Sequence, residues 1–511
     1  MLFNDIWTED VGSTTTTTHC YVQGKQKKNM YSKLALDVEI VARNLVHKNL
    51  QNEKYIGIIS ENTYDFLVFD LACVRLGLIT IYLQEDDLFQ DSDFLCVLQY
   101  VIVSKMMLHN QLNIMHVQDF FDANVPVRDA IVYWKNYEPE DVFTVTFTSG
   151  TFGGKKAIEV KCKSLDDFIV NTARLFPIVQ NDKIMIFLPF STYINRCYVY
   201  MALYYGFDML IVPLSRFLRA LNEDHPTIVV GVPYVFELFM ESYQQKTNGN
   251  VFLFILDKIC KCMYRAGLSP QNYMFAKAWG GSVKYLLVGS AHTSLKVLSF
   301  YQENGIILYE GYGMSEIGGM ISLNTPNNYK LGSVGRPFPN KEISIDLSRQ
   351  IVVKGEFFAN FQYMSPSTYN DVYVDENTVN TGDIGFFDQD GYLYIDGRIK
   401  NMLVLANGRK ISPEAIEIEL VSIEGVRQCF VYGENKMYIV ALLVIHDGAD
   451  ADAIRNEIEK RNQQTSEYQR IRKCYFTNEG FTIENEMLNS SLKLNRAKIV
   501  EHYRNSLDSL Y

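Results

Sequence analysis

The chain has 511 residues, of which 48 % are hydrophobic and 21 % charged, as is typical of a globular protein with more than one domain. Its formal net charge of −11 argues against general nucleic-acid binding, so an anionic ligand would need local cations. The nine cysteines include no CxxC pair, which argues against zinc or disulfide frameworks and fits a reducing, cytoplasmic setting. We expect no signal peptide, and the most apolar run, 197–213, is too short and broken for a membrane span.

Apolar and amphipathic segments alternate through the first part of the chain. Residues 55–60 predict a strand, Phe66 and Phe69 belong to a helix that ends at Gly77, and 78–83 predict the next strand. This βαβ unit implies a parallel sheet. Further strands are predicted at 100–103, 130–134, 184–188, 209–212 and 227–232. The predicted fold class is therefore α/β, with mostly parallel sheets and helices on their faces.

Residues 144–160 predict a strand, a polar loop and a returning strand. The loop reads Thr148-Ser149-Gly150-Thr151-Phe152-Gly153-Gly154-Lys155-Lys156. Glycines free backbone N–H groups, hydroxyls add donors and lysine adds charge, so the loop suits a phosphate chain. The alternative is an ordinary hairpin with a solvated tip. It is not a Walker A loop, because the position five after Gly150 is occupied by Lys155.

Three later motifs contain small or polar residues next to predicted strands. The strand 284–288 ends in Gly289-Ser290-Ala291, where a flat ring could approach the backbone or the chain could simply turn into a helix. The strand 306–308 leads into Tyr309-Glu310-Gly311-Tyr312-Gly313-Met314-Ser315-Glu316, which could otherwise be an edge-strand bend with a solvated glutamate. Thr381-Gly382-Asp383 and Asp396-Gly397-Arg398 bracket a hairpin around 388–391, a pattern that ordinary β-turns also show.

The sequence becomes more charged after residues 396–401. We therefore predict a large domain over 1–397 and a small α+β C-terminal domain over 398–511. The small domain is more charged, with short strands at 404–405, 428–432 and 438–445 and helices near 413–422 and 452–461. Its tail contains Leu492-Lys493-Leu494-Asn495-Arg496 before a final helix. A lysine at such a place is usually a surface charge.

In this order, the motifs resemble those of the adenylate-forming superfamily, which contains acyl-CoA synthetases, peptide-synthetase adenylation domains and firefly-type luciferases. The loop 148–156 is similar to Thr-Ser-Gly-Thr-Thr-Gly-x-Pro-Lys, and Tyr312–Glu316 to Tyr-Gly-x-Thr-Glu. Thr381–Asp383 matches Thr-Gly-Asp, Gly397–Lys400 matches Gly-Arg-x-Lys/Asp, and residues 407–414 resemble Asn-Gly-x-x-Ile-x-Pro-Glu of long-chain acyl-CoA synthetases. Lys493 and Arg496 have the spacing of the C-terminal catalytic loop. The resemblance covers roughly residues 30–505.

The resemblance implies roles for these positions in ATP binding and catalysis. The phosphates of ATP would be held by Thr148, Ser149, Gly150, Thr151 and Lys156. The adenine slot would be built from Gly289, Ser290, Ala291, Glu310, Gly311 and Tyr312, followed by Gly313 and Met314. Ser315 would touch the α-phosphate and Glu316 would hold Mg²⁺. Asp383 and Arg398 would bind the ribose. Lys493 would act catalytically, with Lys156 and Glu316, and Lys400 would be the hinge.

By this resemblance the chain is a ligase that activates a carboxylic acid to an acyl-adenylate and transfers it to a thiol, either coenzyme A or the phosphopantetheine of a separate carrier protein. We expect a fatty or aryl acid. Counting from Gly206, Thr192 and Tyr193 fall at the acid pocket, and Tyr193 replaces the aspartate of α-amino-acid domains. One alternative is a stand-alone amino-acid adenylation domain. The other is a non-catalytic ATP-binding scaffold whose phosphate loop is degenerate because of Phe152 and Lys155.

Overall fold

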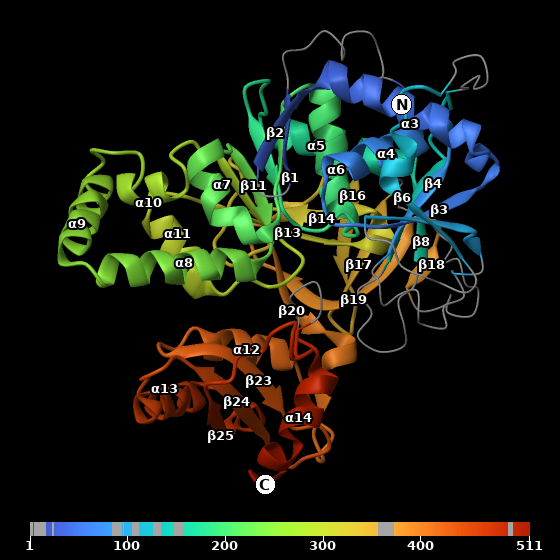
Figure 1. The fold of residues 1–511 in the computed structure, drawn as a ribbon. Helices are drawn as coiled ribbons and strands as arrows, with labels where there is room; N and C mark the ends of the chain where they lie inside the picture. Colours follow the sequence, from blue (N-terminus) through green and yellow to red (C-terminus); the bar gives the residue numbers. More distant parts are fainter. Residues whose placement is uncertain are drawn as a thin grey trace.

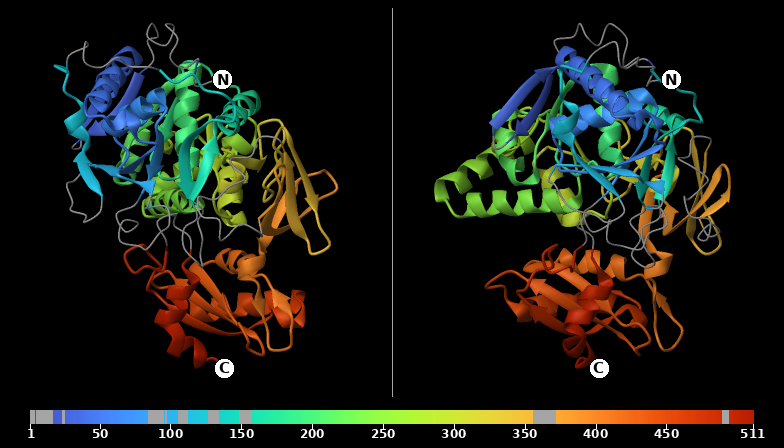
Figure 2. Two further views of the ribbon diagram at one scale, coloured as in Figure 1. Left: turned by 90° about the vertical axis from the view of Figure 1, so that its right-hand side faces the viewer. Right: turned by 45° about the vertical axis from the view of Figure 1, so that its right-hand side comes forward.

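The computed structural model describes residues 4, 17–22, 25–83, 95, 97–104, 112–125, 134–147, 157–355, 372–488 and 494–511. These residues form a large domain and, below it in Figure 1, a small C-terminal domain. Figure 2 shows the two bodies from two further sides, and the small domain lies below the large one in both. The predicted loop 148–156, Lys493 and the predicted strand 130–134, except Trp134, lie outside the described residues.

One sheet of the large domain has the order β6-β5-β3-β4-β7-β8, and its neighbours run parallel except for the last pair. Every residue of β3 is buried, which explains its unbroken apolar sequence. The antiparallel pair β7 and β8 is the hairpin predicted around the polar loop. The strands are β3 (Tyr55–Ile59), β4 (Ile79–Tyr82), β5 (Tyr100–Val103), β6 (Asn113–His116), β7 (Val142–Phe147) and β8 (Ala157–Lys161).

A second sheet has the order β15-β14-β13-β12-β11-β9-β10-β1-β2. Its central strands, from β13 to β1 in this order, are parallel, while the pairs at both edges are antiparallel. The strands are β1 (Thr17–Val22), β2 (Lys25–Met30), β9 (Lys183–Ile186), β10 (Asp208–Ile211), β11 (Ile228–Gly231), β12 (Tyr285–Val288), β13 (Leu308–Met314), β14 (Gly319–Leu323) and β15 (Arg336–Pro337). The predicted α/β architecture is thus confirmed.

Helices cover both sheets and build two hydrophobic cores. α4 (Tyr64–Leu76), α5 (Cys162–Leu175) and α6 (Tyr193–Tyr205) share one core with residues of both sheets, and α3 (Tyr31–His47) packs on α4. The second core lies on the other face of the nine-stranded sheet, around the fully buried Trp279. Its helices are α7 (Phe217–Asp224), α8 (Pro233–Asn248), α10 (Tyr273–Ala278) and α11 (Leu295–Glu303), with α9 (Val251–Arg265) at the outer edge (Figure 1).

A third, antiparallel sheet follows in the sequence and carries the Thr381 and Arg398 motifs on adjacent strands. It consists of β16 (Lys341–Ile345), β17 (Gln350–Gly355), β18 (Tyr373–Asp375), β19 (Thr378–Phe387) and β20 (Leu393–Arg398). The hairpin predicted around 388–391 joins β19 to β20, where the Asp388 N–H donates to the Tyr392 carbonyl. Arg398 is still a residue of β20, and the division after residue 397 stays a prediction.

The small domain is built on a three-stranded sheet with a hydrophobic core on each face. α12 (Pro413–Val421) and α13 (Ala451–Gln464) cover one face, and α14 (Arg496–Asp508) covers the other. The sheet has the strands β23 (Val426–Tyr432), β24 (Ile439–Ile445) and β25 (Ile471–Thr477), and a separate hairpin has β21 (Leu403–Val404) and β22 (Lys410–Ile411). One contact with the large domain joins His446 Nε2 to Glu241 Oε1 of α8, at 3.7 Å.

The connection between the domains is packed tightly at Gly397. Its backbone has φ of +145°, and a Cβ atom there would lie 2.1 Å from Ser412 Oγ. The Ser412 hydroxyl donates to the Asp396 carbonyl at 2.6 Å, just before α12 begins. Lys400, the predicted hinge, follows in the short helix η9 (Ile399–Asn401) and is exposed. Only a residue without a side chain fits position 397 in this arrangement.

Candidate active site

The candidate site begins at the carboxyl ends of the neighbouring parallel strands β12 and β13. Val288 pairs with Glu310, so Gly289 follows beside Gly311. A Cβ atom at Gly289 would lie 3.0 Å from the Gly311 carbonyl oxygen, and Ser290 has φ of +69°. Two glycines thus leave a flat stretch of backbone at the edge where ligands of open α/β sheets bind. This surface fits the adenine slot that the sequence predicts.

β13 extends farther than the sequence predicts. The expected strand ended at residue 308, whereas the observed strand continues to Met314, so Gly311, Tyr312, Gly313 and Met314 are strand residues. The reason is antiparallel pairing with β14, with an irregularity between Tyr312 and Gly313. At Gly313, a Cβ atom would lie 2.3 Å from the Gly319 carbonyl oxygen, so close pairing requires glycine there.

Glu310 is a buried carboxyl group in this strand, with 4 % of its surface exposed. Burial raises its pKa to about 8. The carboxyl is therefore mainly protonated at neutral pH and has one O–H donor and one carbonyl acceptor. A neutral donor–acceptor pair of this kind suits the edge of a heterocyclic base.

Tyr312 connects β13 to the third sheet through a carboxylate. Its hydroxyl donates to Asp383 Oδ2 at 2.6 Å, and Arg398 Nε lies 2.8 Å from Asp383 Oδ1. Asp383 is 2 % exposed, whereas the Arg398 side chain is 46 % exposed. Burial and the nearby carboxylate raise the pKa of the Tyr312 phenol well above its usual range. The three predicted residues form one hydrogen-bonded group.

The backbone around Asp383 is fixed by Thr381. The Thr381 hydroxyl donates to the Ile351 carbonyl at 2.8 Å, and the Asp383 N–H donates to the same hydroxyl at 3.1 Å. Gly382 between them has φ of +72° and no atom within 4 Å of a would-be Cβ. The Thr-Gly-Asp sequence therefore makes a bulge within β19 that presents one buried carboxylate.

Ser315 and Glu316 lie beside the end of β7, where the predicted phosphate loop begins. The Ser315 hydroxyl donates to the carbonyl of Phe147, the last residue of β7, at 3.3 Å. The Tyr373 hydroxyl donates to the Glu316 carbonyl at 3.1 Å, which holds the short helix η7 (Ser315–Ile317) in place. The end of β13 is thus joined to the strand that enters the loop 148–156, and the side chains of Thr148, Ser149, Gly150, Thr151 and Lys156 belong to residues outside the described ranges.

A magnesium ion fits this arrangement through one carboxylate. Within the described ranges, no cluster of three or more His, Cys, Asp or Glu side chains is placed to hold a metal. Mg²⁺ needs no such cluster, because it keeps several waters and commonly binds through one or two carboxylates together with substrate phosphates. Glu316, next to Ser315 and the start of the loop, is a donor of the kind required.

The two predicted pocket residues lie at the start of α6. Thr192 is its N-cap residue, and Tyr193 is buried, with its ring centroid 6.3 Å from that of Phe143. The Tyr193 hydroxyl interacts with the Cys197 thiol one turn later in α6, and burial raises the pKa of the Tyr193 phenol well above its usual range. Position 193 is occupied by a tyrosine and not by an aspartate, so a substrate ammonium group would find no negative charge at this residue.

Sequence reasoning missed a buried charged group beneath β7. The Arg196 side chain, 2 % exposed, donates to the Thr144 hydroxyl at 2.6 Å and lies 3.9 Å from Asp70. Asp70 accepts further hydrogen bonds from the Tyr200 hydroxyl at 2.5 Å and the Thr80 hydroxyl at 2.9 Å. This group explains the buried hydroxyl of Thr144 in β7. Its signals in the sequence are the alternating threonines of 144–148 and the charged residues Asp70 and Arg196 within apolar segments.

Comparison with known proteins agrees with this geometry. The family model described as AMP-binding enzyme matches residues 9–358, and the model of the AMP-binding enzyme C-terminal domain matches residues 400–511. The chain belongs to the AMP-binding enzyme family. The resemblance to adenylate-forming enzymes and the expectation of an AMP-forming ligase are confirmed.

Individual relatives are distant but extend over most of the chain. One is the long-chain-fatty-acid–CoA ligase FadD15 of Mycobacterium bovis, 23 % identical over 93 % of this chain and 91 % of that protein. Another is the long-chain-fatty-acid–CoA ligase 1 of Cavia porcellus, 26 % identical over 73 % of this chain and 61 % of its own length. A similar solved structure is o-succinylbenzoate CoA synthetase (MenE) of Bacillus subtilis with the acyl-adenylate OSB-AMP. The TM-score is 0.77 at 18 % sequence identity, and the match covers 98 % of this chain and 97 % of that chain. This last similarity supports the fold.

Proposed function

We propose that this enzyme activates a long-chain fatty acid with ATP, releases pyrophosphate and transfers the acyl group from the acyl-adenylate to coenzyme A. The observation that carries the proposal is the hydrogen-bonded group of Tyr312, Asp383 and Arg398 beside the flat backbone of Gly289 and Gly311. A buried carboxylate next to a glycine-lined slot provides what a ribose and its base require. The names of the ligases above support a fatty acid and CoA.

Each residue of the group has a part in this proposal. The adenine ring lies against the Gly289–Gly311 backbone and the Tyr312 ring, while protonated Glu310 offers a donor and an acceptor to the base. Asp383 accepts hydrogen bonds from the ribose hydroxyls, and Arg398 and the Tyr312 hydroxyl hold its carboxylate in place. Because these contacts are made before the reaction, they orient the α-phosphate toward the acid.

The chemical step joins two anions, and the chain must offset the charge that develops. The attacking carboxylate forms a bond to the α-phosphorus while the bond to pyrophosphate breaks. Magnesium held by Glu316 would neutralise phosphate charge. We assign Ser315 to the α-phosphate, the loop residues with Lys156 to the departing phosphates, and Lys493 to the reacting oxygens. In the second step, the CoA thiolate attacks the acyl carbon and AMP leaves.

The transfer step requires a different position of the small domain. We propose that residues 398–400 are the hinge, with Lys400 exposed on η9 and Gly397 tightly packed before it. Rotation there would withdraw Lys493 and bring another part of the small domain to the thiol route.

The test is pyrophosphate release measured over a panel of acids: fatty acids of increasing chain length, aryl acids, a dicarboxylic acid and amino acids. We expect release with long-chain acids, followed by thioester formation with CoA. Turnover only with a pantetheinylated carrier protein would reassign the acceptor. ATP binding without release for any acid would contradict the proposal and favour the scaffold.

A pair of lysine variants tests the catalytic assignment. Lys493→Ala should lower acyl-adenylate formation by a factor on the order of 10²–10³ with little change in ATP affinity. The matched control is Lys498→Ala, because Lys498 is an exposed lysine of α14 that pairs with Glu486 and Glu501. Normal adenylation by Lys493→Ala would remove Lys493 from the mechanism.

A further inference from the structure

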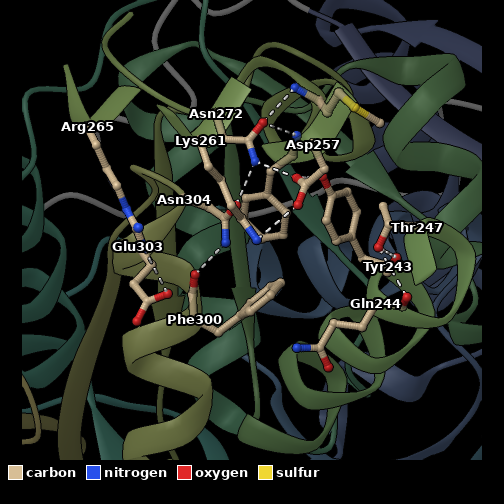
Figure 3. A network of polar contacts seen from close by, with 12 residues as sticks. Tyr243, Gln244, Thr247, Asp257, Lys261, Arg265, Asn272, Phe300, Glu303 and Asn304 are labelled. Carbon is tan, nitrogen blue, oxygen red and sulfur yellow. Dashed lines mark hydrogen bonds and ion pairs between the residues drawn. The ribbon is translucent and has the colours of Figure 1, made fainter. Parts of the chain in front are cut away.

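Helix α9 faces the large domain with a mixed side that includes a buried carboxylate, Asp257. Its only buried residues are Asp257 and Cys260. Asp257 accepts hydrogen bonds from the Tyr243 hydroxyl and the Asn272 amide, each at 2.7 Å, and pairs with Lys261 at 3.0 Å. Figure 3 shows this network between α8, α9, α10 and α11. The network fixes the rotation of α9 about its own axis, because turning the helix would leave a buried carboxylate without its donors.

The opposite side of α9 is apolar and exposed. We define the α9 face as five residues with exposed fractions between 43 % and 76 %: Val251, Phe252, Ile255, Ile259 and Met263. Val251, Ile255, Ile259 and Met263 recur every four positions, so they lie on one side of the helix. α9 is the outermost helix of the large domain in Figure 1. A helix that turns a buried carboxylate inward and exposes a row of apolar side chains presents a surface suited to a second apolar phase.

Cations lie along one edge of the α9 face. Lys258, Lys261 and Arg265 are spaced by three and four positions, which places them on the same side of the helix. Residues 246–284 contain six lysines and arginines against one aspartate, although the whole chain has a net charge of −11. A basic segment within an acidic protein attracts anionic surfaces selectively.

We propose that α9 lies flat in the surface of a lipid bilayer that contains anionic lipids. Exposed aromatic and aliphatic side chains enter the acyl boundary, and the cationic edge contacts the headgroups, as in other interfacial amphipathic helices. The inference does not depend on the identity of the acid, since binding to lipid is measured without turnover.

The experiment is co-sedimentation of the full chain with vesicles of phosphatidylcholine alone and of phosphatidylcholine with phosphatidylglycerol. We expect partition into the anionic vesicles, weakened by added salt. Phe252→Ser/Ile259→Ser should lower the partition coefficient at least about tenfold. The matched control is Leu347→Ser, because Leu347 is a fully exposed leucine far along the chain, between β16 and β17.

A charge variant separates the two contributions. Lys258→Glu should lower partition into anionic vesicles roughly tenfold and leave the weak binding to neutral vesicles unchanged. Lys354→Glu is its control, since Lys354 is an exposed lysine of β17. Absence of wild-type binding, or equal binding by the serine variant, would overturn the proposal. Dimers that disappear in the serine variant, without vesicle binding, would assign the α9 face to a second copy.

Discussion

The hydroxyl of Tyr312 donates a hydrogen bond of 2.6 Å to Asp383 Oδ2 and thereby joins two different sheets. Tyr312 belongs to β13 of the nine-stranded sheet, and Asp383 belongs to β19 of the antiparallel sheet. Because the carboxylate is buried, its orientation depends on its few hydrogen-bond partners. This bond joins Asp383, which we propose as the ribose carboxylate, to the strand that contains Gly311.

Replacement of Tyr312 by phenylalanine tests that relationship. Loss of a hydrogen bond to a charged group costs about 1.5–3 kcal/mol, so Tyr312→Phe should raise the KM for ATP roughly tenfold or more. Tyr301→Phe is the control, because Tyr301 is buried and donates to the Phe236 carbonyl at 3.0 Å in the other core. Steady-state pyrophosphate release, measured against ATP concentration, gives the KM for ATP of both variants. An unchanged KM in Tyr312→Phe would remove the bond from nucleotide binding.

Glu310 should make the free enzyme less stable as the pH rises. Its pKa is about 8 in the folded chain against a usual value of 4.5, so the folded state holds the proton more tightly. The associated stability is fully present below pH 4.5 and is lost as the pH rises through about 8. Glu310→Gln keeps a donor and an acceptor but does not titrate. At alkaline pH its free energy of unfolding should therefore exceed that of the wild type by on the order of a few kcal/mol.

Urea unfolding of both proteins across this pH range measures the difference. Glu342→Gln is the control, because Glu342 is an exposed glutamate of β16. Parallel stability curves for wild type and Glu310→Gln would show that the Glu310 carboxyl is ionised throughout.

The buried pair of Arg196 and Asp70 should be sensitive to removal of one partner. Asp70→Asn leaves the Arg196 guanidinium in the core without its carboxylate, which typically costs about 3–5 kcal/mol. Asp452→Asn serves as comparison, because the pair of Asp452 and Arg455 is exposed and should change stability by less than about 1 kcal/mol. Chemical denaturation, monitored by circular dichroism, gives the free energy of unfolding of both variants. Equal stability of the two variants would show that the Arg196 charge is compensated elsewhere.

The contact between Glu241 and His446 should bias the position of the small domain weakly. Both side chains are partly exposed, so an ion pair with protonated His446 contributes at most about 1 kcal/mol. Glu241→Gln should then shift the population of the observed domain arrangement by no more than about fivefold, measured by fluorescence energy transfer between labelled domains. Glu424→Gln, an exposed glutamate of the small domain, should leave it unchanged. A complete loss of the arrangement would show a larger interface contribution.

The strands that carry the site could be predicted because each is a short apolar run next to glycines and polar residues. The bulge at Thr381–Asp383 follows from local sequence, since glycine and threonine determine backbone geometry within a few residues. The approach of Gly289 to Gly311, in contrast, depends on the pairing of β12 with β13. The end of β13 could not be predicted, because its last residues depend on pairing with β14.

The pair of Arg196 and Asp70 lay beyond sequence reasoning for a different reason. Each residue interrupts an apolar helix, and only the packing of α6 and α4 against the same sheet brings them together. The exposure of α9 was equally hidden, because Val-Phe-Leu-Phe-Ile-Leu at its start is typical of a buried helix. Burial is a property of the assembled domain and not of the segment.

The close contact between Gly397 and Ser412 also constrains how this sequence can evolve. Any side chain at position 397 would occupy the place of the Ser412 hydroxyl. A smaller residue at 412 would relieve that contact, but it would leave the φ of +145° and the approach of Glu414 Oε2 to 3.1 Å. We therefore expect homologues with this backbone conformation to keep glycine at position 397 even where position 412 varies.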